Sequence, residues 1–210
     1  VGGRLAAGAR LASLFGVRAP GKALDLFAIL AHDGRGVLEA ARILVADAYP
    51  ALTPTCPQAH LFEREIWEQF GVEPMDHPWL KPVRYHAPAP FGSGDGPRPE
   101  PCCGEFFRMA GPEVHEVAVG PVHAGIIEPG HFRFQCLGET VHHLEIALGF
   151  QHRGVEALLM GGPDARTPHL MEALAGDTTI GHAWAHAGAM EALAGTRVPP
   201  RAQEIGRAHV

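Results

Sequence analysis

The segment 57–71, PQAHLFEREIWEQFG, is the most regular stretch of the sequence and decides the fold of its first half. It opens with a proline, which suits the first turn of a helix because no N–H is needed there. Leu61, Ile66 and Phe70 fall on one side, and charged residues fall on the other. The final glycine stands where many helices end in the left-handed conformation. The pattern predicts a helix over 57–70.

Charged residues form the polar side of this helix. Glu63, Arg64 and Glu65 are consecutive, and such a run is typical of the outward side of an amphipathic helix. We expect them to form a docking face or a solvated helix surface. The following segment, 72–86, carries three prolines. We therefore expect it to be extended and to lie over another surface.

Two apolar runs precede the helix, at 24–31 (LDLFAILA) and 37–45 (VLEAARILV), and HDGRG separates them. An Asp-Gly pair between apolar runs is a strong hairpin signal. We therefore predict two antiparallel strands. A helix over 37–45 is the alternative, because Leu, Glu, Ala and Arg favour helices.

The composition is that of a soluble globular protein, with 46% hydrophobic and 19% charged residues. The net charge of −6 provides no support for nucleic-acid binding, which needs a basic surface. No apolar run approaches the ~20 residues of a membrane span, so we expect no direct span. The four cysteines form no CxxC pair. This spacing favours reduced thiols in a cytoplasmic setting.

A Pro/Gly-rich segment without periodicity, 87–112, is predicted to be a linker between domains at 1–86 and 113–204. In the second domain, β-type runs at 117–127, 130–137 and 140–148 precede helical runs at 150–160, 169–174 and 178–194. The first residue is Val1 rather than Met, and 205–210 (IGRAHV) is similar to a translated sequencing adapter. We expect a fragment, with 205–210 as a candidate non-native tail.

The helix motif and its tail resemble a known family. The stretch 60–84, HLFEREIWEQFGVEPMDHPWLKPVR, resembles the closing motif of the 30 kDa subunit of respiratory complex I. That motif has the form ERExx(D/E)xFG, followed by GHP and a basic ending. Asp76 stands where the family has the glycine before His-Pro. The resemblance implies a small α/β domain.

The second half is similar to the start of the 49 kDa subunit of complex I, and closer to the large subunit of energy-converting nickel–iron hydrogenases of the formate hydrogenlyase type. The stretch 120–134, GPVHAGIIEPGHFRF, matches their GPxHxGxxEPGHFR form, and 190–204, MEALAGTRVPPRAQE, matches a later helix and loop. The resemblance implies an α+β chain in which a 30 kDa-like domain is fused to the β-hairpin and helical start of a large subunit.

That resemblance implies a subunit of a redox-driven ion pump. Iron–sulfur clusters would lie in a neighbouring small subunit, and membrane-arm subunits would be the other partners. The chain would lie peripherally on the cytoplasmic side of the inner membrane. The alternatives are a non-catalytic scaffold between the iron–sulfur subunit and the membrane arm, and a quinone-reducing C/D-type subunit of complex I.

The ligand positions of the resembled families carry other residues here. In the hydrogenases a CGxC pair supplies two thiolates to nickel and iron, and its positions correspond to Ala175 and Thr178. Alanine cannot ligate a metal, and threonine is a poor, hard substitute, so we expect no nickel–iron centre and no cofactor bound by this fragment. The histidine and tyrosine that hold a quinone in complex I correspond to Ile127 and Gly176.

Five polar residues remain as candidates for proton transfer or for binding a polar ligand. By the resemblance, the two segments that carry them face each other around the reaction cavity; the residues are His123, Glu128, His131, Asp177 and His182. The first three are predicted on one loop that ends before a strand at Arg133.

Structural roles are the competing interpretations. Asp177 could be a helix N-cap. His182 and His186, four apart on a helix, lack a third metal ligand, which favours packing or surface roles. Arg153 is predicted to make an internal ion pair beside a turn.

Overall fold

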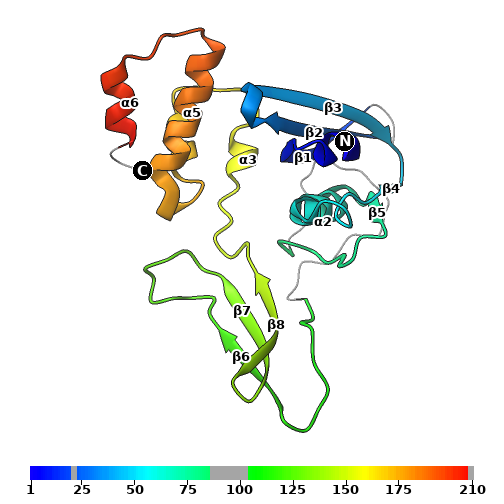
Figure 1. Ribbon diagram of the computed structural model, residues 1–210. Coiled ribbons are helices and arrows are strands. Elements are labelled where there is room, and N and C mark those ends of the chain that lie inside the picture. Colours follow the sequence, from blue (N-terminus) through cyan, green and yellow to red (C-terminus); the bar gives the residue numbers. More distant parts are fainter. Residues whose placement is uncertain (20–22, 86–103, 208–210) are drawn as a thin grey trace. The chain divides into compact units, whose positions relative to one another are not determined.

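The computed structural model describes residues 1–19, 23–85 and 104–207, and the chain divides into two compact units, 1–106 and 107–210 (Figure 1). The predicted linker 87–112 spans this division, and its residues 87–103 lie outside the described residues. Of the candidate tail 205–210, the first three residues continue the last helix and the rest lie outside the described residues.

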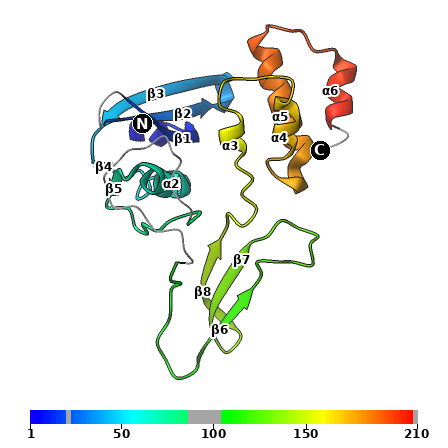
Figure 2. The ribbon, with the colours of Figure 1, turned by 180° about the vertical axis from the view of Figure 1, so that it is seen from behind.

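The first unit is built from a three-stranded antiparallel sheet and one longer helix. Its elements are α1 (Gly2–Ala6), β1 (Arg10–Arg18), β2 (Leu24–His32), β3 (Val37–Val45), β4 (Ala48–Pro50), α2 (His60–Phe70) and β5 (Glu73–Met75), with 3-10 turns η1 (Asp33–Arg35) and η2 (Pro57–Ala59). The sheet has the order β1-β2-β3, and β4 pairs with β5 in parallel. Figure 2 shows α2 against one side of the large sheet.

The predicted hairpin at 24–45 is confirmed. Every residue of β3 pairs with β2, from His32↔Val37 to Leu24↔Val45, so the helical alternative over 37–45 is wrong. The turn closes through η1, and Gly36 takes the left-handed conformation with φ of 62°. The helix prediction also holds, since α2 ends at Gly71 with φ of 70°.

The core of the first unit lies between β2 and α2. Leu24 and Leu30 are completely buried on the inner side of β2, and Ile66 of α2 packs among them. Gly16 on β1 permits this packing, because a Cβ there would lie 2.8 Å from a methyl group of Leu24. Burial of such side chains contributes about 2 kcal/mol each.

The second unit contains a three-stranded antiparallel sheet and a run of helices. Its elements are β6 (Val114–Val119), β7 (His131–Leu137), β8 (Thr140–Ala147), α3 (Val155–Leu158), α4 (Thr167–Glu172), η3 (Gly176–Thr178), α5 (Thr179–Leu193) and α6 (Pro200–Arg207). The order is β6-β7-β8. Helix α4 packs on α5. No helix of the described residues is long and apolar enough to cross a membrane.

Two predicted boundaries in this unit were wrong. The strand predicted over 117–127 ends at Val119, because Gly120 and Ala124 have φ values of 82° and 55°, and a residue with positive φ does not continue a strand. The helix predicted over 150–160 shortens to α3, which begins after the left-handed Gly154. The predicted strand at 140–148 and helix at 178–194 are confirmed within a few residues.

The two sides of the second sheet are covered in an unexpected way. On β7 the polar residues at 131 and 135 are buried, whereas Phe132 and Phe134, predicted to be core residues, are half-buried. Their cross-strand neighbours Leu144 and Ile146 are exposed. The more deeply buried side of this sheet is therefore polar.

Candidate functional site

The first carboxylate of the ERE motif is internal. Glu63 is 0% exposed, and its carboxylate accepts hydrogen bonds from the Leu52 N–H at 2.7 Å, the Thr53 N–H at 3.0 Å and the Thr53 hydroxyl at 2.6 Å. The prediction of a docking face or solvated surface is therefore wrong for Glu63. The physical reason is that three donors replace the water that a buried carboxylate loses.

Tyr49 of β4 lies in the same interior. Its burial, and next the charge of Glu63, raise the pKa of its hydroxyl. Tyr49 therefore stays neutral beside the buried carboxylate, and Glu63 meets no second anion there.

A second buried carboxylate, Glu68, holds the segment that follows the helix. It is 1% exposed and accepts hydrogen bonds from three consecutive amides, Val83 at 2.8 Å, Arg84 at 3.1 Å and Tyr85 at 2.7 Å. The side chain one turn earlier, Arg64, donates to the carbonyls of Lys81 and Pro82. The prediction that 72–86 lies over another surface is confirmed, and that surface is α2.

The loop between β6 and β7, residues 120–130, contains the second cluster of predicted residues. Glu128 Oε1 accepts a hydrogen bond from the Gly176 N–H at 2.8 Å and pairs with Arg153 Nη2 at 2.9 Å. Arg153 also donates to the Ala173 carbonyl at 3.1 Å. The Gly176 amide, and then Arg153, lower the pKa of Glu128. The loop and the start of η3 therefore meet through an ionised carboxylate.

The two histidines of the loop bind its own backbone. His123 Nε2 donates to the Gly130 carbonyl at 2.8 Å, and His131 Nδ1 donates to the Gly120 carbonyl at 3.2 Å. His131 is the first residue of β7 and not a loop residue, which corrects the prediction. Gly120 is required here, because a Cβ at this position would lie 2.2 Å from the Gly130 carbonyl oxygen. These bonds close the loop on itself.

Asp177 and His182 lie along the start of α5. Asp177 is exposed in η3 and makes no capping bond, and the N-cap of α5 is Thr178. The N-cap interpretation of Asp177 is therefore wrong; instead the Thr179 hydroxyl donates to the Gly176 carbonyl at 2.8 Å. His182 is half-buried on α5. Its predicted role in proton transfer or ligand binding remains a prediction.

The donor set at η3 does not fit a nickel–iron centre. Ala175 and Thr178, at the expected cysteine positions, flank Gly176 and offer no thiolate. Cys56 and Cys136, the cysteines within the described residues, are buried in the first unit and in β7. Across residues 1–19, 23–85 and 104–207, no group of three His, Cys, Asp or Glu residues is placed to hold a metal ion.

The quinone positions also lack suitable side chains. Ile127 is 51% exposed and apolar. Gly176 has no side chain, and its amide already donates to Glu128. A headgroup bound as in complex I would therefore find no hydrogen-bonding side chain at either position.

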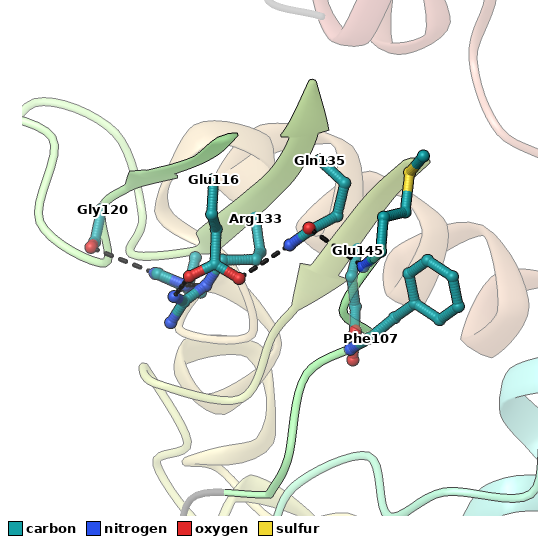
Figure 3. A network of polar contacts seen from close by, with 8 residues as sticks. Phe107, Glu116, Gly120, Arg133, Gln135 and Glu145 are labelled. Atoms are coloured by element: carbon teal, nitrogen blue, oxygen red, sulfur yellow. Dashed lines mark hydrogen bonds and ion pairs between the residues drawn. The ribbon is translucent and has the colours of Figure 1, made fainter. Parts of the chain in front are cut away.

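A polar network on the covered side of the second sheet was not predicted (Figure 3). Glu116 pairs with Arg133 and accepts from Gln135 Nε2 at 2.7 Å. Gln135 Oε1 accepts from the Met109 amide at 3.3 Å, and Glu145 accepts from the Phe107 amide at 2.9 Å. The alternation of polar residues along 131–135 was the available signal. The network attaches segment 107–109 to the sheet.

Comparison with known proteins shows what the two units are similar to. Residues 7–91 match the family described as the respiratory-chain NADH dehydrogenase 30 Kd subunit. The first unit therefore contains a 30 kDa-subunit-like domain, as its motif predicted.

Curated relatives extend the similarity beyond that domain. Formate hydrogenlyase subunit 5 of Escherichia coli is 30% identical over 174 residues, covering 75% of this chain and 30% of the relative. Hydrogenase-4 component G of Escherichia coli is 29% identical over 172 residues, covering 75% and 31%. The C/D subunit of the NADH-quinone oxidoreductase of Methylococcus capsulatus is 26% identical over 204 residues, covering 75% and 31%.

The chain spans about a third of the length of these relatives. It is homologous to subunits of hydrogenase and NADH-quinone oxidoreductase complexes, and the oxidoreductase-complex part of the prediction is confirmed at that level.

Proposed function

We propose that this chain is a peripheral subunit of a membrane-associated oxidoreductase complex and helps to couple electron transfer to ion movement without a nickel–iron centre of its own. Its partners would be an iron–sulfur subunit, which carries the clusters, and the membrane-arm subunits on the cytoplasmic side. The relatives in formate hydrogenlyase, hydrogenase-4 and NADH-quinone oxidoreductase complexes support this class.

The hydrogen bond between Glu128 and Gly176 carries the proposal about the site. A helix start favours an anion, and here a carboxylate from the 120–130 loop occupies that position at 2.8 Å. Ala175 and Thr178, on either side of Gly176, cannot supply the soft thiolates that nickel and iron require. The start of η3 would thus be neutralised by a carboxylate in place of metal-bound thiolates.

Metal analysis of the purified complex tests the loss of the centre. The expected result is iron from the partner's clusters and no nickel that scales with this subunit. One nickel per copy of the chain, retained after dialysis against a chelator, would overturn the proposal.

Within this proposal, Glu128 is a poor proton carrier near neutral pH. The Gly176 amide and Arg153 favour its ionised form and lower its pKa, and a group that stays ionised cannot donate a proton at that pH. Asp177, which is exposed, and His182, half-buried in the first turn of α5, are the better candidates for proton transfer or for binding a polar ligand.

The engagement of Glu128 also favours a second candidate function, that of a scaffold. Its carboxylate joins loop 120–130, Arg153 and η3, which suits a rigid link between the iron–sulfur subunit and the membrane arm. Turnover of the assembled complex with Asp177→Ala or His182→Ala separates the two candidates. A loss of turnover with normal assembly supports proton transfer, and unchanged turnover supports the scaffold.

A further inference from the structure

A pair of histidines in the first unit lies outside the site described above. The rings of His60, at the start of α2, and His77, after β5, stack with centroids 5.6 Å apart and an interplanar angle of 28°. Both side chains are half-buried. They bring the beginning of α2 against the beginning of the segment that Glu68 and Arg64 hold, residues 77–85.

Both histidines act as hydrogen-bond acceptors. His60 Nε2 lies 3.3 Å from Arg64 Nη1, and a guanidinium can only donate. His77 Nδ1 accepts from the Trp79 N–H at 3.1 Å, and an amide N–H can only donate. An imidazolium has no acceptor nitrogen, so each bond exists only while its ring is neutral. A proton on either ring therefore removes one bond.

The second nitrogen of His77 adds to this. In the neutral ring that accepts at Nδ1, the proton is on Nε2, and this atom is buried without a hydrogen-bond partner among the described residues. The positive charge of a protonated ring would thus be shared with a buried nitrogen that makes no hydrogen bond, which is costly.

The charges around the two rings oppose further cations. Burial is the main cause that lowers the pKa of both rings, and Arg64 lowers both further. Glu63 opposes the lowering of the pKa at both rings, and the backbones of His60 and Trp79 oppose it at His77. The Glu63 oxygens are already occupied by donors from Leu52 and Thr53. Protonation of both rings would gather three cations around one buried carboxylate.

Arg64 connects the histidine pair to the rest of the segment. The same guanidinium that donates to His60 also donates to the carbonyls of Lys81 and Pro82. The next residues, 83–85, donate to Glu68. Repulsion from an imidazolium at His60 would therefore act directly on the side chain that fixes 81–82.

We propose that the 77–85 segment is bound to α2 through neutral histidines and loosens from it when His60 and His77 take up protons. Such a segment is a pH-sensitive device. It is attached to α2 near neutral pH and detached progressively as the pH falls below about 6.5, the ordinary value for histidine. The direction follows because the detached state takes up protons that the attached state resists.

Hydrogen exchange of the 210-residue chain tests this. Rates at the amides of 79 and 83–85, corrected for the intrinsic effect of pH, should rise about tenfold between pH 7.5 and pH 5.5, since one unit of pKa difference is tenfold. The double variant His60→Gln, His77→Asn keeps a neutral acceptor near each ring nitrogen and should show no such rise. His142→Asn, at an exposed position of β8, is the matched control and should behave like the wild type.

Two results would overturn the proposal: protection at 83–85 that does not depend on pH, or a dependence that persists in the double variant. If the double variant fails to fold, nitrogen chemical shifts of the wild-type rings decide. At pH 7.5 His60 should carry its proton on Nδ1 and His77 on Nε2, and both should titrate below about 6.5. Titration of both rings at or above that value also overturns it.

Discussion

Glu128 Oε1 lies 2.8 Å from the backbone nitrogen of Gly176, and this hydrogen bond joins residues 48 positions apart in the sequence. It brings together the two segments that carry the predicted site residues. Because the bond is made by a carboxylate and a backbone amide, its loss can be measured without knowing the reaction.

Substitution Glu128→Gln should weaken this contact. A neutral amide oxygen accepts a weaker hydrogen bond from Gly176 and does not pair with Arg153. We expect the Gly176 amide to exchange several-fold faster at pH 7, measured by hydrogen exchange. Glu139→Gln, at an exposed turn of the same unit, is the control, and equal rates in both variants would contradict the role of Glu128.

The same contact should depend on pH in acid. The pKa of Glu128 is lowered from 4.5, so its stabilising effect is present above that value and is lost as the pH falls through the lower folded value. Protection of the Gly176 amide should therefore remain constant from about pH 7 to about pH 5 and decline below 4.5. A decline that begins about pH 6 would point to a histidine instead.

Substitution Glu63→Ala should destabilise the first unit by about 3 kcal/mol, because it leaves the donors of Leu52 and Thr53 buried without an acceptor. Urea unfolding provides the measurement. Glu65→Ala, two residues away, removes only the half-exposed pair with Arg84 and should cost less than about 1 kcal/mol. Similar costs for the two variants would mean that Glu63 is not the buried member of the motif.

Substitution Gln135→Leu should cost about 2 kcal/mol in the second unit, because the leucine leaves the Met109 amide and one oxygen of Glu116 without their partner. Thermal unfolding measures the effect, and Gln151→Leu at an exposed position should change stability by less than about 0.5 kcal/mol. If Gln135→Leu is neutral, segment 107–109 is held to the sheet by other contacts.

The double variant Ala175→Cys, Thr178→Cys should acquire a soft-metal site that the wild type lacks. Residues i and i+3 of a 3-10 turn lie on one side, so two thiolates would face one ion. Cadmium–thiolate absorption in the near ultraviolet should appear in the variant. The same absorption in the wild-type chain would show that Ala175 and Thr178 are not the reason for the missing donor set.

Several features followed from the sequence because they are local. The hairpin at 24–45 depends on an Asp-Gly turn between apolar runs, and α2 depends on helical periodicity closed by Gly71. The 30 kDa-like motif and the absent cysteine pair were also visible, since each is a pattern of neighbouring residues. By contrast, β1 was not predicted, because its pairing with β2 spans residues up to 21 apart, as in Arg10↔Ala31.

Other features were decided by the tertiary structure alone. A charged run such as Glu63-Arg64-Glu65 looks the same whether it faces water or donors, and the buried Glu63 is settled by the Leu52–Thr53 backbone that folds over it. In the same way, the sequence identifies Glu128 as a candidate, but its ionised state depends on an amide and a guanidinium brought from other segments, which lower its pKa. Burial and charge state are properties of the surroundings of a side chain. Those surroundings exist only after distant parts of the chain have packed together.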